Sequence, residues 1–357
     1  MSQYNIQLLE LARKLRQLTQ KEVAAATGVS QAQISKAEHG LQRLCNEDLK
    51  KLAGYYNMPV NFFFQSESMT PAGHFYYRKR LAISDKVIDS FEAKVQILKS
   101  AIDKLMSDSD TPDYTIGSFS TVESSPSEIA SKVRHLLQIY KGPVPKLTSL
   151  LENHGVIVFF FDFGTDKIDG LSSVTSSNRK VIFLNSRMPN DRIRFSLAHE
   201  LGHLVMHSDF IPSSAAEAEE QADEFASEFL MPSDEIKDSL HNLTFASLAQ
   251  LKRYWQVSMK ALLYKANKLE VITSTEYRNM QINFSKKGYT KSEPIPLSFN
   301  PPVIISMVLE LYKSELGYSD EEIRKTLCLS ASDFSEWFGH RQQAVTISLQ
   351  DYMLNTK

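Results

Sequence analysis

The chain has 357 residues, of which 42% are hydrophobic and 23% charged, a composition typical of a soluble globular protein with two or three domains. Its 40 Lys and Arg residues nearly balance its 42 Asp and Glu residues, so any nucleic-acid-binding surface must be local. The two cysteines exclude a disulfide framework and a cysteine-rich zinc module, and the first residues show no secretory signal. The longest apolar run, 156–161, is too short to cross a bilayer and is typical of a buried strand. We expect a cytoplasmic protein with no membrane partner.

Four regions follow one another along the chain, and the predicted fold class is mainly α (α+β). Residues 1–66 show short amphipathic patterns and are expected to form a five-helix domain. Residues 67–125 contain one periodic helix, ISDKVIDSFEAKVQILKSAIDKLM, followed by a Ser/Asp/Thr-rich sequence that we interpret as a linker. Residues 126–273 combine a small sheet with several helices, and residues 274–357 are expected to be helical, with an unknown role. The strands predicted in the third region are 155–161, 169–175 and 181–184.

A helix–turn–helix pattern lies within the first region. Thr19 with Glu22, and Ser30 with Gln33, have the spacing of capping boxes, in which two side chains satisfy backbone N–H groups at the start of a helix. Gly28 lies between the two helices and allows the positive φ that a tight turn requires. The second helix of the pair is therefore expected to leave one face exposed.

That exposed face carries Gln31, Ala32, Gln33 and Lys36. Gln makes bidentate hydrogen bonds to adenine, Ala contacts the thymine methyl group, and Lys reaches guanine or a phosphate. These residues predict salt-dependent binding to double-stranded DNA. Because one copy makes few base contacts, strong binding to an operator would need a homodimer. The alternative is a small helical scaffold that docks another protein.

The first region resembles the lambda-repressor-like (XRE) helix–turn–helix family over residues 5–64. The matching residues are Thr19-Gln20, Gly28-Val29-Ser30, Ile34-Ser35, Glu38, Gly40 and the ending LKKLAGYYNMPVNFFF. By this resemblance Gln20 contacts a phosphate, while Gln31, Ala32, Gln33 and Lys36 read bases.

A His-Glu-x-x-His motif lies in RIRFSLAHELGHLVMH, where His199 and His203 are four residues apart. On a helix these two imidazoles lie on one face, close enough to bind one Zn²⁺. Ser196, Glu200 and His207 fall on the same narrow strip, and the rest of the helix surface is apolar. Burying an unpaired polar group costs about 1–3 kcal/mol, so a polar strip in an apolar surround predicts a metal ion rather than a solvated face.

Two histidines do not complete a catalytic zinc site, which has three protein ligands and a water. His207 lies about 12 Å along the helix axis from His199, so we interpret it as a group that supports a ligand or lies at the surface. The third ligand is therefore expected to be a carboxylate from another element.

The downstream sequence SSAAEAEEQADEFASEFLMP predicts an acidic helix that supplies this carboxylate. Four of its carboxylates are predicted to lie on the solvated face: Glu217, Glu220, Glu224 and Glu228. Glu219 instead falls within the apolar arc, and Asp223 lies at its edge. Because a carboxylate on a buried face is expected to be paired or to bind a metal, Glu219 is the predicted third ligand. Asp223 is expected to orient a ligating histidine.

This set of residues resembles the ImmA/IrrE family of zinc metallopeptidases over residues 126–273. The matching segments are IDG at 168–170, VIFLNS, RIRFSLAHELGHLVMH, the block from Glu219 to Phe229-Leu230-Met231-Pro232, and VSMKALLYKANKLEVI. The resemblance implies a zincin-like α+β fold, with His199, His203 and Glu219 as zinc ligands and Glu200 as the general base. The family often has Arg where this chain has Lys265, which puts the role of that residue in doubt.

The chemistry that this site predicts is amide hydrolysis, in which Glu200 takes a proton from the attacking water and delivers it to the leaving nitrogen. Residues 181–184 are predicted to form an edge strand on which an extended peptide docks. The resemblance implies a DNA-binding transcriptional regulator that cleaves a helix–turn–helix repressor, or itself at the linker 107–125, in stress or mobile-element control. Two alternatives stay open: a metal domain that acts as a sensor with little proteolysis, and an antitoxin-like binder that represses its own operon.

Overall fold

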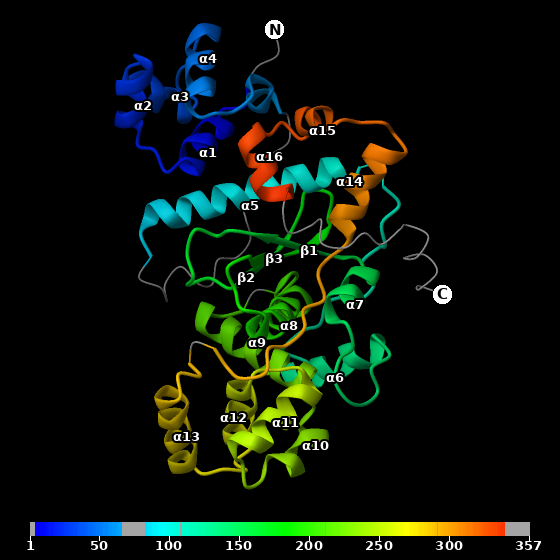
Figure 1. Ribbon diagram of the computed structural model, residues 1–357. Helices are drawn as coiled ribbons and strands as arrows, with labels where there is room; N and C mark the ends of the chain where they lie inside the picture. Colours follow the sequence, from blue (N-terminus) through cyan, green and yellow to red (C-terminus); the bar gives the residue numbers. More distant parts are fainter. Residues whose placement is uncertain (1–3, 66–82, 108, 211, 291, 340–357) are drawn as a thin grey trace.

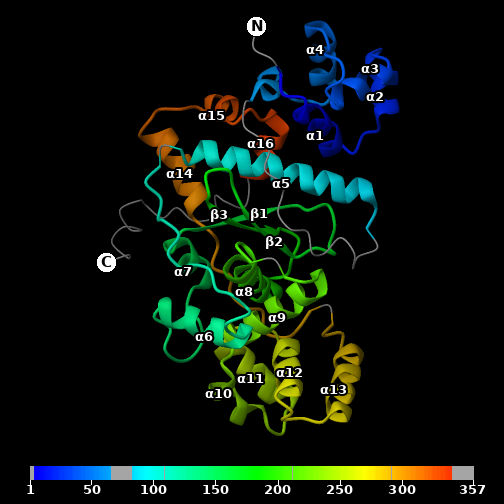
Figure 2. The same ribbon diagram turned by 180° about the vertical axis from the view of Figure 1, so that it is seen from behind.

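The computed structural model describes residues 4–65, 83–107, 109–210, 212–290 and 292–339, and within these ranges the chain is mainly helical around one small sheet (Figure 1). The N-terminal helices lie at one end of the molecule, the sheet lies in the middle, and a group of helices from the second half of the chain lies at the other end. Figure 2 shows the same order from behind. No helix in the described ranges is long and apolar enough to span a membrane. The predicted fold class is confirmed.

The N-terminal region contains the five predicted helices. They are α1 (Gln7–Leu15), α2 (Gln20–Thr27), α3 (Gln31–Glu38), α4 (Asn46–Tyr55) and the 3-10 helix η1 (Val60–Phe64). Both capping boxes form, because the Thr19 and Ser30 hydroxyls accept from the backbone N–H groups of Glu22 and Gln33. Gly28 ends α2 with a φ of 73°, in the left-handed region that favours glycine.

The sheet has three strands, β1 (Val156–Phe161), β2 (Gly170–Val174) and β3 (Lys180–Asn185), in the order β1-β3-β2. Strand β3 pairs with β1 in parallel and with β2 in antiparallel orientation. The three strands were predicted, but the prediction that 181–184 form an edge strand is wrong. Because β2 and β3 pair as a hairpin and β1 pairs with the other side of β3, β3 is central and β1 and β2 are the outer strands.

Both faces of the sheet are covered, which explains why all six residues of β1 are buried. On one face Ile157, Phe159 and Phe161 belong to a core shared with α5 (Asp85–Leu105) and with the C-terminal helices. These helices are α14 (Ile304–Ser314), α15 (Asp320–Thr326) and α16 (Ala331–Phe338). On the other face Val158 belongs to a second core. That core contains the helices that carry the candidate site.

The second core is built from helices between residues 126 and 286. They are α6 (Pro126–Leu136), α7 (Leu147–Asn153), α8 (Asn190–His207), α9 (Ala215–Leu230), α10 (Ser233–Ile236), η3 (Lys237–Leu240), α11 (Phe245–Trp255), α12 (Met259–Lys268) and α13 (Ser274–Lys286). Helices α8 and α9 pack closely against each other, and α8 also packs against β2 and β3. A Cβ on Gly202 of α8 would lie 3.0 Å from the Phe225 ring of α9, which shows how closely the two helices approach.

The segment 109–125 is packed against the protein and is not the open linker that its polar composition predicts. Ile116 is only 2% exposed and belongs to the second core. The Phe119 N–H donates to the Val205 carbonyl at 2.7 Å, and a Cβ on Gly155 would lie 2.3 Å from the Asp113 backbone. A few apolar residues therefore anchor a segment whose other residues are polar.

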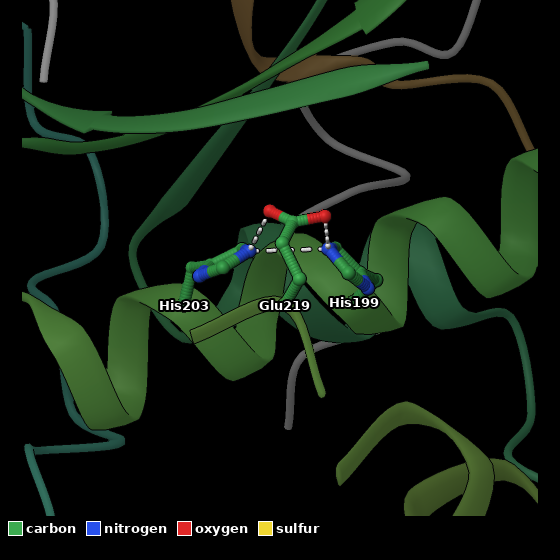
Figure 3. Close-up of side chains that lie close together, drawn as sticks. All are labelled: His199, His203 and Glu219. Atoms are coloured by element: carbon green, nitrogen blue, oxygen red, sulfur yellow. Dashed lines mark hydrogen bonds and ion pairs between the residues drawn. The ribbon is translucent and has the colours of Figure 1, made fainter. Parts of the chain in front are cut away.

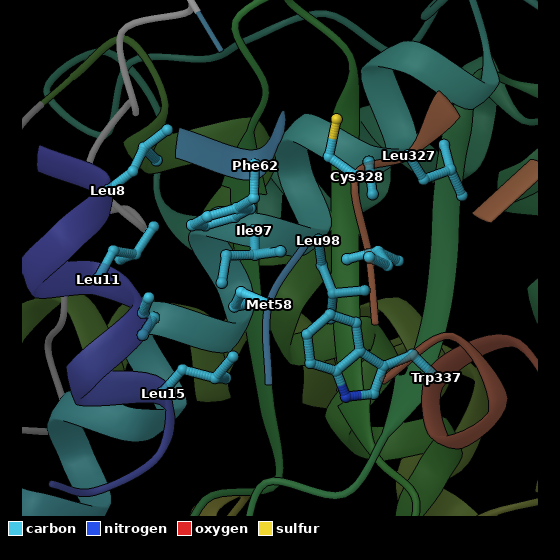
Figure 4. Packing of buried hydrophobic residues seen from close by; sticks show 14 of the residues in the cluster. Leu8, Leu11, Leu15, Met58, Phe62, Ile97, Leu98, Leu327, Cys328 and Trp337 are labelled. Atoms are coloured by element: carbon cyan, nitrogen blue, oxygen red, sulfur yellow. The ribbon is translucent and has the colours of Figure 1, made fainter. Parts of the chain in front are cut away.

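The N-terminal helices share a core with α5 and the C-terminal helices (Figure 4). Leu8, Leu11 and Leu15 of α1 face the same cluster as Leu98 of α5 and Trp337 of α16. The C-terminal region, as far as it is described (to residue 339), contains the predicted helices, and the described residues of 287–303, between α13 and α14, form no helix. Helices α14 to α16 share a core with the first region and with one face of the sheet. Residues 340–357 lie outside the described residues.

Candidate metal centre

Three predicted ligands converge from two helices. His199 and His203 lie one turn apart on α8, and Glu219 points toward them from α9 (Figure 3). The His199 Nε2 and His203 Nε2 atoms are 3.1 Å apart. The Glu219 carboxylate oxygens lie 3.9 Å from His199 Nε2 and 3.5 Å from His203 Nε2. One donor atom from each residue therefore faces a common point, with all three within 4.8 Å of one another.

These separations fit a tetrahedral metal ion. Ligand atoms at about 2.0–2.1 Å from a tetrahedral Zn²⁺ are about 3.3 Å from one another. The two histidine Nε2 atoms, 3.1 Å apart, lie close to that value. The two Glu219 oxygens lie 3.5 Å from His203 Nε2 and 3.9 Å from His199 Nε2, one oxygen on each, so a metal ion would draw the carboxylate only slightly closer. Two imidazoles and one carboxylate are also a donor set that divalent zinc prefers. The assignment of the three residues as ligands stays a prediction.

The neighbouring polar residues contact these histidines as expected. The His199 Nδ1 atom is 2.8 Å from an Asp223 carboxylate oxygen, which accepts the Nδ1 proton, so Nε2 is the atom that faces the site and that a metal would bind in place of its proton. His207 is 4% exposed, and its Nδ1 atom lies 2.9 Å from His203 Nδ1. His207 is therefore not a surface group, and its contact places it behind His203.

The electrostatics of the site favour a cation. Burial lowers the pKa of His199, but Asp223, Glu200 and Glu219 outweigh that effect and raise the pKa to about 9. Burial lowers the pKa of His203 to about 4, so its imidazole is neutral near pH 7 and able to act as a ligand. The carboxylates that stabilise an imidazolium at His199 would equally stabilise a divalent ion between the three donors.

The predicted base, Glu200, lies beside the metal centre under strand β2. Its side chain is buried, and burial raises its pKa to about 7, an effect partly offset by His199 and by hydrogen bonds from Ser172. A pKa near neutrality suits a group that must take up and release a proton. Gly170 leaves room for this side chain, because a Cβ there would lie 2.8 Å from Glu200 Cγ.

Several contacts at the site were not predicted from the sequence. Glu228 does not lie on a solvated face: its carboxylate is 2.6 Å from the Lys265 ammonium and also accepts from Ser233. This ion pair gives Lys265 a role in holding α12 to α9. Ser172 and Gln221 were also missed. They are common polar residues with no motif, and only the strand and helix packing places them beside Glu200 and His207.

The predicted DNA-contacting residues lie on α2 and α3. Gln31, Ala32 and Lys36 are exposed on α3. The side-chain oxygen of Gln33, Oε1, accepts from the Ser30 N–H in the capping box, so in this structure that atom is occupied by a contact within the protein. The Gln20 amide donates to Glu38 at 2.8 Å, an internal contact beside the phosphate contact that the resemblance implies. The assignment of these five side chains to DNA contacts stays a prediction.

Comparison with known families agrees with both parts of the chain. Residues 9–63 match the family described as helix-turn-helix, and residues 151–267 match the family described as the IrrE N-terminal-like domain. A search of curated proteins gave no match. The fold and these matches define a DNA-binding regulator with a metallopeptidase-like domain. More specifically, the chain joins an XRE-type helix–turn–helix domain to an ImmA/IrrE-type domain. The domain boundaries at 66, 125 and 273 stay predictions.

Proposed function

We propose that the protein is a transcriptional regulator of the cytoplasm whose central domain is a zinc-dependent endopeptidase. The observation that carries the proposal is the convergence of His199, His203 and Glu219 on one point, with a buried carboxyl group, Glu200, next to it. The Asp223 carboxylate accepts from Nδ1 of His199, on the opposite side of the ring from the proposed ligand atom Nε2, and so orients this ring. These features together are those of a hydrolytic site rather than of a structural ion site, which would have four protein ligands.

Each residue has a defined task in peptide hydrolysis. A divalent ion at this centre would polarise the scissile carbonyl and make a bound water more acidic. Glu200 takes the proton from the attacking water and passes it to the leaving nitrogen. His199, His203 and Glu219 would hold the metal, and Asp223, which accepts from His199 Nδ1, would orient the His199 ring so that Nε2 faces it.

The geometry points to β2 as the strand on which an extended peptide docks. Strand β2 is an outer strand that pairs only with β3 among the described residues. The backbone N–H of Ser172 hydrogen-bonds Glu200, so it is directed away from β3. A peptide that pairs with this outer edge would lie directly beside Glu200.

The proposed substrate is a helix–turn–helix repressor, on the basis of the resemblance to the ImmA/IrrE family. Self-cleavage at 107–125 is less well supported, because Ile116 and Phe119 hold the described part of this segment against the protein. A peptidase needs a substrate segment that can extend along its site. A separate protein supplies such a segment more readily than this docked one.

Metal analysis and cleavage assays of wild type and Glu200→Gln test the peptidase. We expect about one zinc per chain in both proteins, cleavage of a candidate repressor by wild type, and none by Glu200→Gln. Cleavage that survives the substitution would come from another protease. If the metal analysis found no zinc in the wild-type protein, the proposal of a zinc-dependent peptidase would be wrong.

DNA binding is tested separately with the Lys36→Ala variant. We expect a loss of operator affinity and a salt dependence whose slope is reduced by about 1 if Lys36 contacts a phosphate. Lys51→Ala is the control, because Lys51 lies on α4 and forms ion pairs with Glu47 and Asp48. Equal affinities of the two variants would contradict the proposed DNA-contacting face.

One observation favours the alternative, a metal domain that acts as a sensor with little proteolysis. Glu200 is only 7% exposed and His203 8% exposed, and Ser172 hydrogen-bonds the Glu200 carboxyl group. A peptide needs this site to open before cleavage. Zinc binding without cleavage of any tested repressor would support the sensor.

A further inference from the structure

A chain of hydrogen bonds runs from the surface of α9 to the back of His203. The Gln221 Nε2 atom is 3.1 Å from a Glu217 carboxylate oxygen, and Gln221 Oε1 is 2.8 Å from His207 Nε2. The His207 Nδ1 atom is in turn 2.9 Å from His203 Nδ1. His203 and His207 are buried, Gln221 and Glu217 are partly buried, and Ser213 also donates to Glu217.

The donor and acceptor properties of these groups decide which ring nitrogens of His207 and His203 carry a proton, starting from the Glu217 carboxylate. A carboxylate only accepts hydrogen bonds, so the Gln221 amide turns its NH₂ group to Glu217. Its carbonyl oxygen, which also only accepts, then faces His207. The His207 Nε2 atom must therefore carry a proton, and its Nδ1 atom is an acceptor when the ring is neutral.

The same reasoning reaches the metal centre in one more step. Because the His207 Nδ1 atom accepts, the proton between the two rings belongs to His203 Nδ1. The lone pair of His203 then lies on Nε2, the atom that is 3.1 Å from His199 Nε2 and 3.5 Å from Glu219. The other tautomer of His203 would place a proton where a metal must bind.

We propose that Gln221, oriented by Glu217, fixes the tautomer of His207 and thereby presents the His203 Nε2 lone pair to the metal. This inference rests on the proposed function, and it makes Gln221, Glu217 and His207 positioning residues rather than ligands. They do for His203 what the single residue Asp223 does for His199. Asp223 is a carboxylate and accepts directly, whereas a neutral His207 has both a donor and an acceptor and needs Gln221 to choose between them.

Gln221→Leu is the direct test, because it removes the acceptor and leaves His207 free to adopt its other tautomer. We expect about a tenfold or greater loss of Zn²⁺ affinity, measured by competition with a chromophoric chelator. The control is Glu220→Leu, the exposed neighbour on the same helix, which should bind Zn²⁺ as wild type does. Glu217→Ala is a second variant that can be measured if Gln221→Leu does not fold, because Glu217 is only partly buried and lies at the outer end of the chain of hydrogen bonds. It should lower the affinity in the same direction.

Nitrogen-15 NMR of the histidines in metal-free protein provides a readout that does not depend on activity. In wild type we expect His203 protonated on Nδ1 and His207 on Nε2, and in Gln221→Leu a mixture of tautomers at both rings. Unchanged tautomers and unchanged affinity in Gln221→Leu would overturn the inference. If wild type bound no Zn²⁺, the proposed peptidase function would be wrong. The histidine tautomers of wild type and Gln221→Leu would still show whether Gln221 determines the proton positions on His207 and His203.

A conservative substitution separates positioning from packing. His207→Asn keeps an oxygen near the position of Nδ1 that accepts from His203, whereas His207→Leu keeps only the bulk. We expect His207→Asn to bind Zn²⁺ more tightly than His207→Leu. We also expect Gln221→Leu to have little further effect when combined with His207→Asn, because the link that it breaks is already gone. Equal affinities of the two His207 variants would show that the ring only fills space.

Discussion

The residues of the candidate metal centre differ in how well the sequence predicts them. His199 and His203 follow from a motif with fixed spacing, and Glu219 follows from helical periodicity, because it is the carboxylate that falls within the apolar arc. The structure brings all three together. The same periodicity misplaces Glu228, because its partner Lys265 comes from a helix whose position the sequence does not give. Gln221 could not be selected, since its role depends on the distance to His207 across two helices.

Gly170, in the IDG segment, gives a prediction about the proposed general base, Glu200. A Cβ on Gly170 would lie 2.8 Å from Glu200 Cγ and 3.0 Å from its Oε1 atom, so Gly170→Ala should move this flexible side chain rather than the backbone. We expect a folded protein with normal zinc content and a loss of kcat/KM of about a hundredfold, since a displacement of about 1 Å has that effect in active sites. The measurement is peptide cleavage together with metal analysis.

The matched control is Gly54→Ala, a helical glycine with no atom within 4 Å of the added Cβ. This variant should cleave as wild type does. Full activity in Gly170→Ala would show that Glu200 has space to move without leaving its working position.

At the scale of elements, the sequence predicts which segments are strands and helices better than it predicts their neighbours. The runs that become β1, β2 and β3 are visible as apolar or alternating segments, but strand order depends on which hairpins and parallel pairs form. That is why 181–184 were predicted at an edge and lie in the centre. The same limit applies to residues 109–125, where two apolar side chains, Ile116 and Phe119, dock a segment whose composition is polar.

The start of α14 gives a prediction about pH. Glu152 is fully buried on α7, and its carboxylate accepts from the backbone N–H groups of Val303 and Ile304. Burial raises its pKa to about 8, above the value of about 4.3 for an unfolded Glu. The folded state therefore binds this proton more tightly, so the stabilisation is complete below about pH 4 and is lost as the pH rises toward 8.

Glu152→Gln should remove this pH dependence, because the amide keeps an uncharged acceptor at the start of α14. We expect the urea midpoint of wild type to fall more steeply between pH 5.5 and 8.5 than that of Glu152→Gln. Glu276→Gln is the control, since Glu276 is exposed at the start of α13 and its pKa is lowered instead. Parallel pH profiles of wild type and Glu152→Gln would contradict the prediction.

At the scale of the whole molecule, the two matched regions are joined by parts of the chain that carry no motif. The helix–turn–helix helices pack on α5 and on the C-terminal helices, and these in turn cover one face of the sheet (Figures 1 and 4). The sequence predicts α5 and the C-terminal helices as helices but gives no sign that they share one core. Gln31 and Lys36, which are predicted to contact DNA, are exposed in this arrangement.

A buried ion pair contributes to this arrangement. The guanidinium of Arg16, which directly follows α1, donates to both carboxylate oxygens of Asp333 on α16, at 2.7 and 2.6 Å, and also to the Tyr56 carbonyl. The Asp333 side chain is only 3% exposed. Because removal of one partner of a buried pair leaves an uncompensated charge, Arg16→Ala should destabilise this contact by about 3–5 kcal/mol. Hydrogen exchange should then accelerate in α1 and α16 before it changes in α8, which lies in the other core.

The comparison variant is Lys14→Ala, on α1 itself. The ion pairs of Lys14 with Glu10 and Asp89 are between side chains that are at least a third exposed, and such pairs contribute at most about 1 kcal/mol. If Arg16→Ala exchanged its α16 amides no faster than Lys14→Ala does, the Arg16–Asp333 pair would contribute little to the attachment of the helix–turn–helix domain. If only Arg16→Ala accelerates exchange, then the Arg16–Asp333 pair contributes substantially to how firmly the helix–turn–helix domain is held to the part of the chain that carries the candidate metal centre.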